Sequence, residues 1–261
     1  MLTLLSPSKS VTNKELPIGI QSSDVLFPKT TKQLVTHLKK LSKKELQNEL
    51  EVSKSLAELN FQRYLEWDRT DTRPALWLYS GDVYNGLDAF SMSKADVEYA
   101  QNHVAIVSGL FGLVRPLDGI RPYRLEMRLS YSGEWGDTLY DAWSQKITDY
   151  IEKSGETTIL MCASKEYAKV VTKKLPKSIN IVTPRFLQET DDGLKEKGLF
   201  AKYARGALAR YLIDNKIESV TALQKYKEDG FIYSKNLSTA KELVYIVPKD
   251  FTLKGRFTQN T

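Results

Sequence analysis

The chain has a single cysteine, Cys162, and only two histidines, His37 and His103, among its 261 residues. One cysteine cannot form an intramolecular disulfide, and these few residues cannot supply a zinc site or a Cys/His nucleophilic pair. The Cys and His count leaves metals with oxygen ligands open, but with no such motif visible we expect no resident metal and no cofactor. Because Cys162 lies in an apolar run, it is predicted to be a buried side chain rather than a redox-sensing thiolate.

Long apolar runs are also missing. The longest, IVSGLFGLV, begins at Ile106 and contains two glycines, whereas a membrane-spanning helix needs roughly 18 to 20 apolar residues. The N-terminal run LTLL has no basic region before it and reaches Pro7 almost at once, so a secretory signal is not expected. These absences predict a protein that is not integral to a membrane and that is located in the cytoplasm.

The composition predicts an ordinary globular chain of moderate positive charge. Hydrophobic residues make up 41% of the sequence, and the formal net charge is +6. This charge permits an anionic partner, either nucleic acid or a phosphorylated metabolite. No internal repeat or low-complexity linker divides the chain, so we expect one domain over residues 1–248. Residues 249–261 form a basic tail that we expect to be disordered.

Strand and helix patterns alternate along the chain, which favours a mixed α/β fold. A capping-box pattern, Ser42 followed by Glu45, divides the first helical region into two helices. Irregular loops between 110 and 137 argue against a regular doubly wound sheet. Strands are predicted at 2–5, 75–80, 103–109, 157–164, 179–184 and just before 200, and helices at 31–67, 94–101, 139–151, 165–173 and within 198–215.

Four polar segments follow the carboxyl ends of predicted strands. In open α/β sheets, the loops at that edge converge on the ligand crevice, so we expect these four segments to lie together. They are SPSK (6–9), GDVYNG (81–86), SGLFGLVRP (108–116) and CASKEY (162–167).

The stretch SGLFGLVRPLDGIRPYRLEM (108–127) is rich in glycine, proline and arginine. In one interpretation, its first two glycines present backbone amides to an anion and its arginines bind phosphate or carboxylate. In the other, its two acidic residues pair with those arginines, and the glycines and prolines only shape a crossover loop. Both interpretations stay open here. The residues concerned are Gly109, Gly112, Arg115, Asp118, Arg121, Arg124 and Glu126.

Asp82 and Glu126 are the candidates for acid/base chemistry, and Lys9 is a candidate cation for an anionic substrate. Each has a plainer interpretation, because aspartate is common in turns and a lysine in a short loop is usually solvated. The same holds for the residues of CASKEY, where a serine and a glutamate suit the first turn of a helix.

Basic residues are concentrated in the C-terminal third of the chain. Between 161 and 216, twelve Lys or Arg residues face six Asp or Glu residues. Within the predicted helix there, Lys202 and Arg205 are three residues apart and share a face. This surface is interpreted either as a nucleic-acid interface or as an ordinary solvated surface.

Taken together, SPSKS, GDVYNGL, the 108–127 stretch, CASKEY and AKYARGALARYLI resemble, in this order and spacing, the YaaA family of bacterial peroxide-stress proteins. The resemblance extends from Met1 to about Val247. It implies a cytosolic protein that protects against hydrogen peroxide by limiting the iron that drives damage to DNA. It also implies a single α/β domain of the kind called the cactus fold, with a helix-hairpin-helix element and a positively charged cleft for double-stranded DNA.

The resemblance assigns these properties to particular residues. The hairpin would fall near Ser108 to Arg115. The anion- or DNA-binding residues would be Lys9, Gly109, Gly112, Arg115, Arg121, Arg124, Lys202 and Arg205, the cleft would also include Asp82, and its lining would include Ser6, Tyr84, Tyr123, Ser164, Glu166 and Tyr167.

Two functions follow from these features. The first is a DNA-binding stress protein without catalysis, which would contact phosphates and read bases poorly. The second is an enzyme acting on a nucleotide or another phosphorylated small molecule, with Asp82 or Glu126 as acid or base. Direct iron binding has little support, because no clustered carboxylate or histidine motif is visible.

Overall fold

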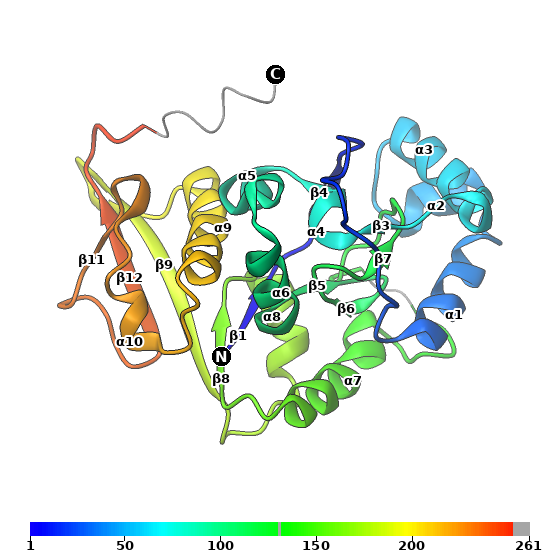
Figure 1. Cartoon of the computed structure of the whole chain (residues 1–261). Helices are drawn as coiled ribbons and strands as arrows, with labels where there is room; N and C mark the ends of the chain where they lie inside the picture. The colour runs from blue at the N-terminus through cyan, green and yellow to red at the C-terminus, as the bar shows by residue number, and fades with distance from the viewer. Residues whose placement is uncertain (130–131, 253–261) are drawn as a thin grey trace.

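A twisted β-sheet runs through the middle of the computed structural model, which describes residues 1–129 and 132–252 (Figure 1). The predicted mixed α/β class is confirmed. Along the sheet the strands are β6 (Gly112–Val114), β5 (Val104–Ser108), β1 (Leu2–Leu5), β8 (Thr158–Met161), β9 (Asn180–Thr190), β12 (Glu242–Val247) and β11 (Ile232–Tyr233), with β10 (Gly193–Lys195) paired to β9.

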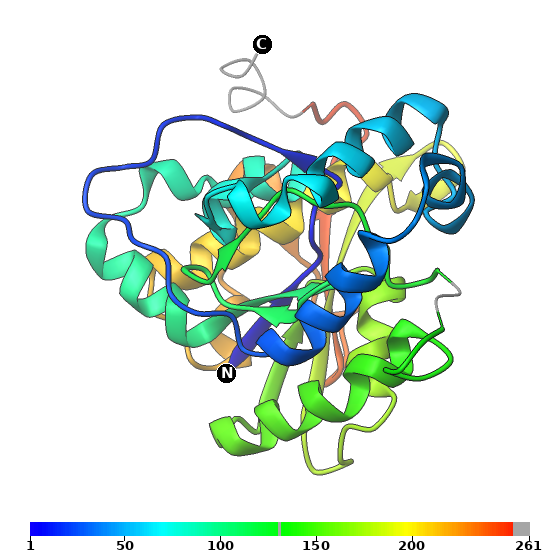
Figure 2. The ribbon, with the colours of Figure 1, turned by 90° about the vertical axis from the view of Figure 1, so that its right-hand side faces the viewer.

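The centre of the sheet, from β5 to β12, is parallel, and antiparallel strands flank it at both ends. Parallel strands are covered on both faces, which explains why every residue of β1 and β5 is buried, including the polar Thr3 and Ser108. Helices α6 and α9 pack on one face of the sheet, and α7 and α8 lie on the other (Figure 2).

Ten α-helices are present in the described residues. Small two-stranded pairs join some of the loops: β2 (Ser10–Val11) with β4 (Tyr79–Ser80), and β3 (Arg73–Pro74) with β7 (Gly119–Ile120). The helices are α1 (Pro28–Leu38), α2 (Lys43–Glu49), α3 (Lys54–Leu65), α4 (Ala75–Leu78), α5 (Asp82–Leu87), α6 (Lys94–His103), α7 (Leu139–Ser154), α8 (Lys165–Thr172), α9 (Gly198–Asp214) and α10 (Val220–Leu223).

The first helical region breaks twice rather than once. The predicted break at Ser42 is confirmed, because its side chain and that of Glu45 form a reciprocal capping box. A second break follows α2, where Glu51 adopts a left-handed φ of 51° and Ser53 caps α3. No glycine or proline marks this break, so the sequence prediction did not include it.

Two predicted strands are wrong. Residues 75–80 form the single helical turn of α4 followed by the short β4, since a buried apolar run of this length fits either structure. The segment expected to be a strand before 200 is instead the first turn of α9, which begins at Gly198.

The expected helix-hairpin-helix at 108–115 is also wrong, because β5 and β6 form an antiparallel β-hairpin there. Its glycines, Gly109 and Gly112, are buried, so they do not present amides to a ligand as expected. A Cβ at Gly112, where φ is 72°, would lie 2.4 Å from the Trp143 ring, and one at Gly109 would lie 2.3 Å from the Leu125 carbonyl. Close packing therefore accounts for both glycines.

The beginning of the predicted basic tail contacts the fold. The Gln188 side-chain nitrogen lies within hydrogen-bond distance of the carbonyls of Pro248, Lys249 and Phe251. The Phe251 ring packs against Phe200 and Phe231. The rest of the predicted tail, residues 253–261, lies outside the described residues.

Candidate ligand-binding cleft at the carboxyl edge of the sheet

The loops after β1 and β8 meet at the carboxyl edge of the sheet, as the sequence predicted. The backbone N–H of Ser164 donates to the Ser6 hydroxyl at 2.8 Å, and the Tyr84 hydroxyl donates to the Ser6 carbonyl at 3.0 Å. Ser164 occupies the N-cap position of α8, but its side chain makes no capping hydrogen bond. Ser6 therefore ties the first loop to both the α8 and α5 segments.

A buried carboxylate lies beside this junction. Glu126 is only 4% exposed, and cations from three directions reach it. Its oxygens lie 3.0 Å from Lys9 Nζ, 2.6 Å from Arg124 Nη2 and 3.5 Å from Arg128 Nε. Arg128 also pairs with Glu51 at 2.6 Å, and its backbone N–H donates to Glu166 at 3.1 Å. The result is a network of alternating charges.

The network keeps Glu126 ionised. Burial by itself opposes the charged form, but the hydrogen bond from Lys9 and the charges of Lys9 and Arg124 outweigh it, so the pKa of Glu126 lies below its usual value. A carboxyl group with a lowered pKa is a poor general acid near neutral pH. Its geometry suits it better to holding Lys9 and Arg124 in place.

A small cavity of about 60 Å³ opens beside this carboxylate. It has room for a group of a few atoms rather than for a whole metabolite. Its lining combines loops after β1, before α7 and at the start of α8. The lining residues are Pro7, Ser8, Lys9, Tyr123, Arg124, Leu125, Glu126, Glu166 and Tyr167.

Buried hydroxyls support the wall of this cavity. The hydroxyls of Tyr79 and Tyr123 lie 2.8 Å apart, and Ser108 Oγ lies 2.6 Å from the Tyr123 hydroxyl. Burial raises the pKa of Tyr123 to about 12, so this hydroxyl stays protonated at physiological pH. The Tyr64 hydroxyl donates to the Arg124 carbonyl at 2.8 Å, which fixes the backbone next to Glu126.

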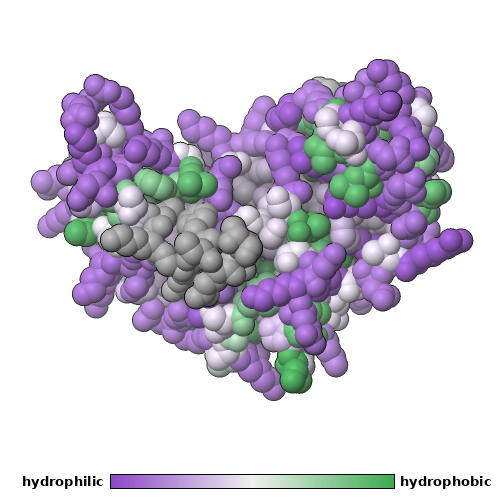
Figure 3. All heavy atoms as spheres, turned by 90° about the horizontal axis from the view of Figure 1, so that it is seen from above, coloured by the Kyte–Doolittle hydropathy of each residue, from purple (hydrophilic) through white to green (hydrophobic). Residues whose placement is uncertain are grey.

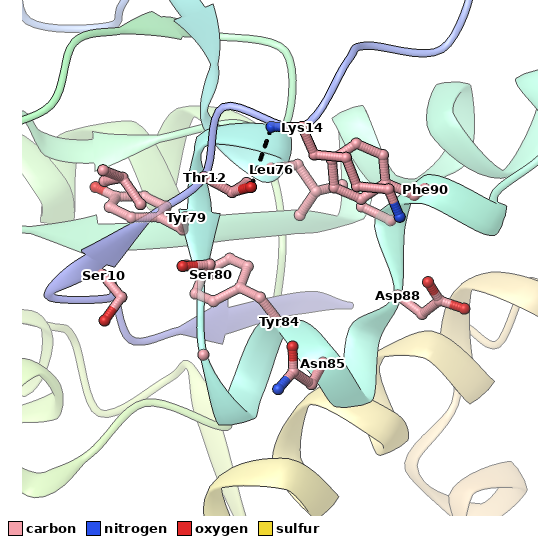
Figure 4. Close-up of a pocket in the computed structure, with 13 residues that line it drawn as sticks. Ser10, Thr12, Lys14, Leu76, Tyr79, Ser80, Tyr84, Asn85, Asp88 and Phe90 are labelled. Carbon is pink, nitrogen blue, oxygen red and sulfur yellow. Dashed lines mark hydrogen bonds between the residues drawn. The ribbon is translucent and has the colours of Figure 1, made fainter. Parts of the chain in front are cut away.

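A second, larger cavity of about 570 Å³ lies beside β2, β4 and α5 (Figure 4). Tyr79 and Tyr84, whose hydroxyls belong to the networks above, present their rings to it. Outside the grey area, the face seen from above is mostly hydrophilic, with scattered hydrophobic patches (Figure 3). The lining residues are Ser10, Val11, Thr12, Lys14, Leu76, Tyr79, Ser80, Gly81, Tyr84, Asn85, Asp88, Ala89 and Phe90.

Of the three arginines of the 108–127 stretch, only Arg124 reaches the cleft. Arg115 follows the antiparallel β6 and pairs with Asp118 at 2.9 Å. Arg121 lies over the Trp67 ring, 5.6 Å from its centroid, and donates to the Thr70 carbonyl at 2.5 Å. The expectation that all three arginines line one cleft is therefore not met in this structure.

The other candidates lie on α5 and α9 and line neither cavity. Arg205 pairs with Glu196 at 2.8 Å, Lys202 is exposed, and Asp82 is half-buried at the first position of α5. The two helices pack closely, since a Cβ at Gly206 would lie 1.8 Å from the Val83 carbonyl. The glycines of α5 and α9 thus allow the two helices to pack closely against each other.

Half of the basic residues between 161 and 216 are ion-paired. Six of the twelve cations form ion pairs: Lys173, Arg185, Lys195, Arg205, Arg210 and Lys216. Of the other six, Lys165, Lys169, Lys174 and Lys177 are exposed and lie on α8 or just after it. We call these four the α8 lysines.

Sequence reasoning missed Arg128, Glu51 and Tyr79 as members of the site. Arg128 is only two residues beyond Glu126 in RLEMR, and this i, i+2 spacing of charges was the available signal. Nothing local could have placed Glu51 there, because it pairs with Arg128 across 77 positions.

Within residues 1–129 and 132–252, no three His, Cys, Asp or Glu side chains are grouped as they would be around a metal ion. No helix in the same residues is both long enough and apolar enough to span a membrane. Cys162 is 1% exposed, and burial raises the pKa of its thiol to about 12, so the reactive thiolate is disfavoured.

Comparison with known proteins matches residues 1–237 to the family described as peroxide stress protein YaaA. A UPF0246 protein of Legionella pneumophila is 37% identical over 94% of this chain and 99% of its own length. A UPF0246 protein of Saccharophagus degradans is 36% identical and one of Burkholderia mallei is 37% identical, each over 94% of this chain and 98% of its own length.

Proposed function

This chain belongs to the family of peroxide stress proteins named YaaA, and we propose that it acts in the cytosol by binding double-stranded DNA and limiting iron-driven damage to it. A role in peroxide stress follows from the family itself. The proposal adds double-stranded DNA as the partner and identifies the protein surface that binds it. It is supported most by one observation: the exposed Lys165, Lys169 and Lys177, in a row that begins at the edge of the cleft, form no ion pair within the described residues.

The α8 lysines are arranged to follow a phosphate backbone. Lys165 and Lys169 are four residues apart on α8 and therefore share a face, about 6 Å apart along the axis. Lys173, one turn further on, continues this face but pairs with Asp141 at 2.6 Å. Lys177 lies just beyond the helix.

The row starts next to exposed cations of the cleft. The Lys9 side chain is 61% exposed and that of Arg128 is 47% exposed. Both contact Glu126, which belongs to the same strand-edge region as the start of α8. A duplex could therefore contact α8 and the cleft rim together. Lysine binds phosphate as a point charge, so the affinity should depend little on sequence.

The test compares two triple variants with equal changes in charge. Lys165, Lys169 and Lys177 are changed to Gln in one, and the exposed Lys225, Lys227 and Lys235 in the other. Fluorescence anisotropy of a labelled 20-base-pair duplex is measured across a salt series. The slope of log K against log salt is about −0.9 for each phosphate contact. Loss of three contacts should therefore make the slope of the first variant less negative by about 2 to 3.

The control triple should keep the wild-type slope, because its lysines lie near β11, far along the sheet from α8. Equal slopes for the two variants would show that α8 is not the DNA surface. Absence of duplex binding by the wild type at low salt would reject the proposal as a whole.

An enzyme acting on a phosphorylated small molecule is the second candidate, and the 570 Å³ cavity beside the cleft favours it. The carboxylates proposed as its acid and base do not line this cavity, and the variants Asp82→Asn and Glu126→Gln test them. This candidate gains if they abolish peroxide resistance in cells while folding and duplex binding persist. Wild-type resistance in both variants would exclude these carboxylates as its acid and base.

A further inference from the structure

The larger cavity has the size and the walls of a small-molecule site. Its 570 Å³ lies within the range of about 300 to 1,000 Å³ that such sites occupy. Tyr79 and Tyr84 line it and are 2% and 7% exposed, so only narrow parts of these side chains border the cavity, while their hydroxyls bond to Tyr123 and to the Ser6 carbonyl. Leu76 and Phe90 add further apolar wall.

Polar groups with unused hydrogen-bonding capacity lie among these rings. Figure 4 shows Asn85 on α5 and Ser10 and Ser80 on the paired strands β2 and β4 around this space. Across the described part of the chain, no hydrogen bond engages the Asn85 carboxamide or the Ser80 hydroxyl. A carboxamide offers a donor and an acceptor side by side, which matches the edge of a nucleobase.

The cavity carries little net charge. Lys14 lies over the Phe90 ring, 4.6 Å from its centroid, and Asp88 accepts a hydrogen bond from Ser91 at 2.7 Å. One cation and one anion in the lining balance each other. The ligand group that fits is therefore neutral and flat, with apolar faces and polar edges, which is the character of a base with its sugar.

The larger cavity is adjacent to the cationic cleft. Lys9 lines the small cavity and Ser10 lines the large one, and consecutive Cα atoms are about 3.8 Å apart. Tyr79 lines the larger cavity and Tyr123 lines the small one, and their hydroxyls are hydrogen-bonded to each other. Because the Lys9 side chain is 61% exposed, a phosphate attached to a ring in the larger cavity can contact it from the solvent side, without crossing the buried wall between the two cavities.

We propose that the larger cavity binds the base and sugar of a single nucleotide whose phosphate lies at Lys9. This assignment rests on the proposed phosphate contacts of the cleft and adds a recognition site for one unstacked nucleotide. The nucleotide comes either from a DNA strand or from the free pool. Both sources present the same chemistry to Asn85 and Lys9.

The experiment titrates the protein with the four deoxynucleoside 5′-monophosphates by calorimetry, and separately with a labelled single strand of eight nucleotides and a 20-base-pair duplex. Asn85→Ala should weaken nucleotide binding by about tenfold or more, as expected for loss of a two-point contact to a base edge. Alanine favours helix, and no hydrogen bond is lost, so this variant should fold; a thermal melt checks this.

The matched control is Asn48→Ala, which removes an exposed carboxamide from α2, far from the cavity. It should leave nucleotide affinity at the wild-type value. Lys9→Gln should weaken binding of a monophosphate but not of the corresponding nucleoside, because only the former carries the phosphate.

Binding of free monophosphates that depends on Asn85 supports the assignment with a free nucleotide as ligand. Dependence on Asn85 only in the single strand supports it with a DNA nucleotide as ligand. No binding of either, or equal affinities for the wild type and Asn85→Ala, would overturn it. Duplex affinity is unchanged in Asn85→Ala if α8 binds DNA, so failure of the cavity assignment is distinguishable from failure of the DNA proposal.

Discussion

Two acidic residues of the same twenty-residue stretch, Asp118 and Glu126, both pair with arginine, yet they do different things. Asp118 is completely buried at the turn after β6 and accepts from Arg115 and from the Ser23 hydroxyl. No cavity described above borders it. Glu126 lies at the opposite edge of the sheet, with three cations around it and a cavity beside it.

The difference shows how to separate a structural ion pair from a binding site. At Asp118 the backbone N–H and the side chain of Arg115 satisfy the same carboxylate, which closes a turn. At Glu126 the cations outnumber the carboxylate, and the Lys9 side chain remains 61% exposed. An exposed ammonium held by a buried carboxylate is available to an incoming anion. The arginine content of the stretch alone does not distinguish the two.

The largest effect that separates the two carboxylates should be on stability. Asp118→Ala leaves the donors of Arg115 and Ser23 without their acceptor, and we expect a loss of about 3 kcal/mol in the free energy of unfolding. Urea denaturation measures it, with the exposed Asp71→Ala as control. A loss no larger than that of the control would mean that Asp118 does not hold the turn together.

The free energy of unfolding should also depend on pH, with a smaller effect that has opposite signs at the two carboxylates. Cations outweigh burial at Glu126 and lower its pKa, whereas at Asp118 burial outweighs the bonds from Arg115 and raises the pKa. A lowered carboxyl pKa contributes stability that is present above about pH 4.5 and is lost as the pH falls through the folded value. A raised pKa contributes stability that grows as the pH falls toward 3.8.

Stability curves from pH 7 to pH 3 test this opposition. The difference in unfolding free energy between the wild type and Glu126→Gln should narrow as the pH falls. The difference between the wild type and Asp118→Asn should widen over the same range. If both differences change in the same direction, the two carboxylates have similar environments, and the contrast between a site and a structural pair is lost.

Much of the fold could be predicted from the sequence, because TTILM is a largely apolar run and LTLL is a short segment that ends at Ser6-Pro7, and both form buried parallel strands. ALWLYS could not be assigned correctly, since a buried run of six residues fits a helical turn as well as a strand. The site was predictable only in part. The sequence could not reveal that the hairpin of β5 and β6 sends Arg115 to one edge of the sheet while Arg124 returns to the other.

Hydrogen–deuterium exchange of the protein with and without a 20-base-pair duplex, at low salt, tests most directly whether the carboxyl edge is the binding surface. We predict slower exchange in peptides covering residues 6–11 and 164–177, and no change in peptides covering 113–121. Protection confined to 113–121, or no protection anywhere under conditions in which the duplex is bound, would contradict this account.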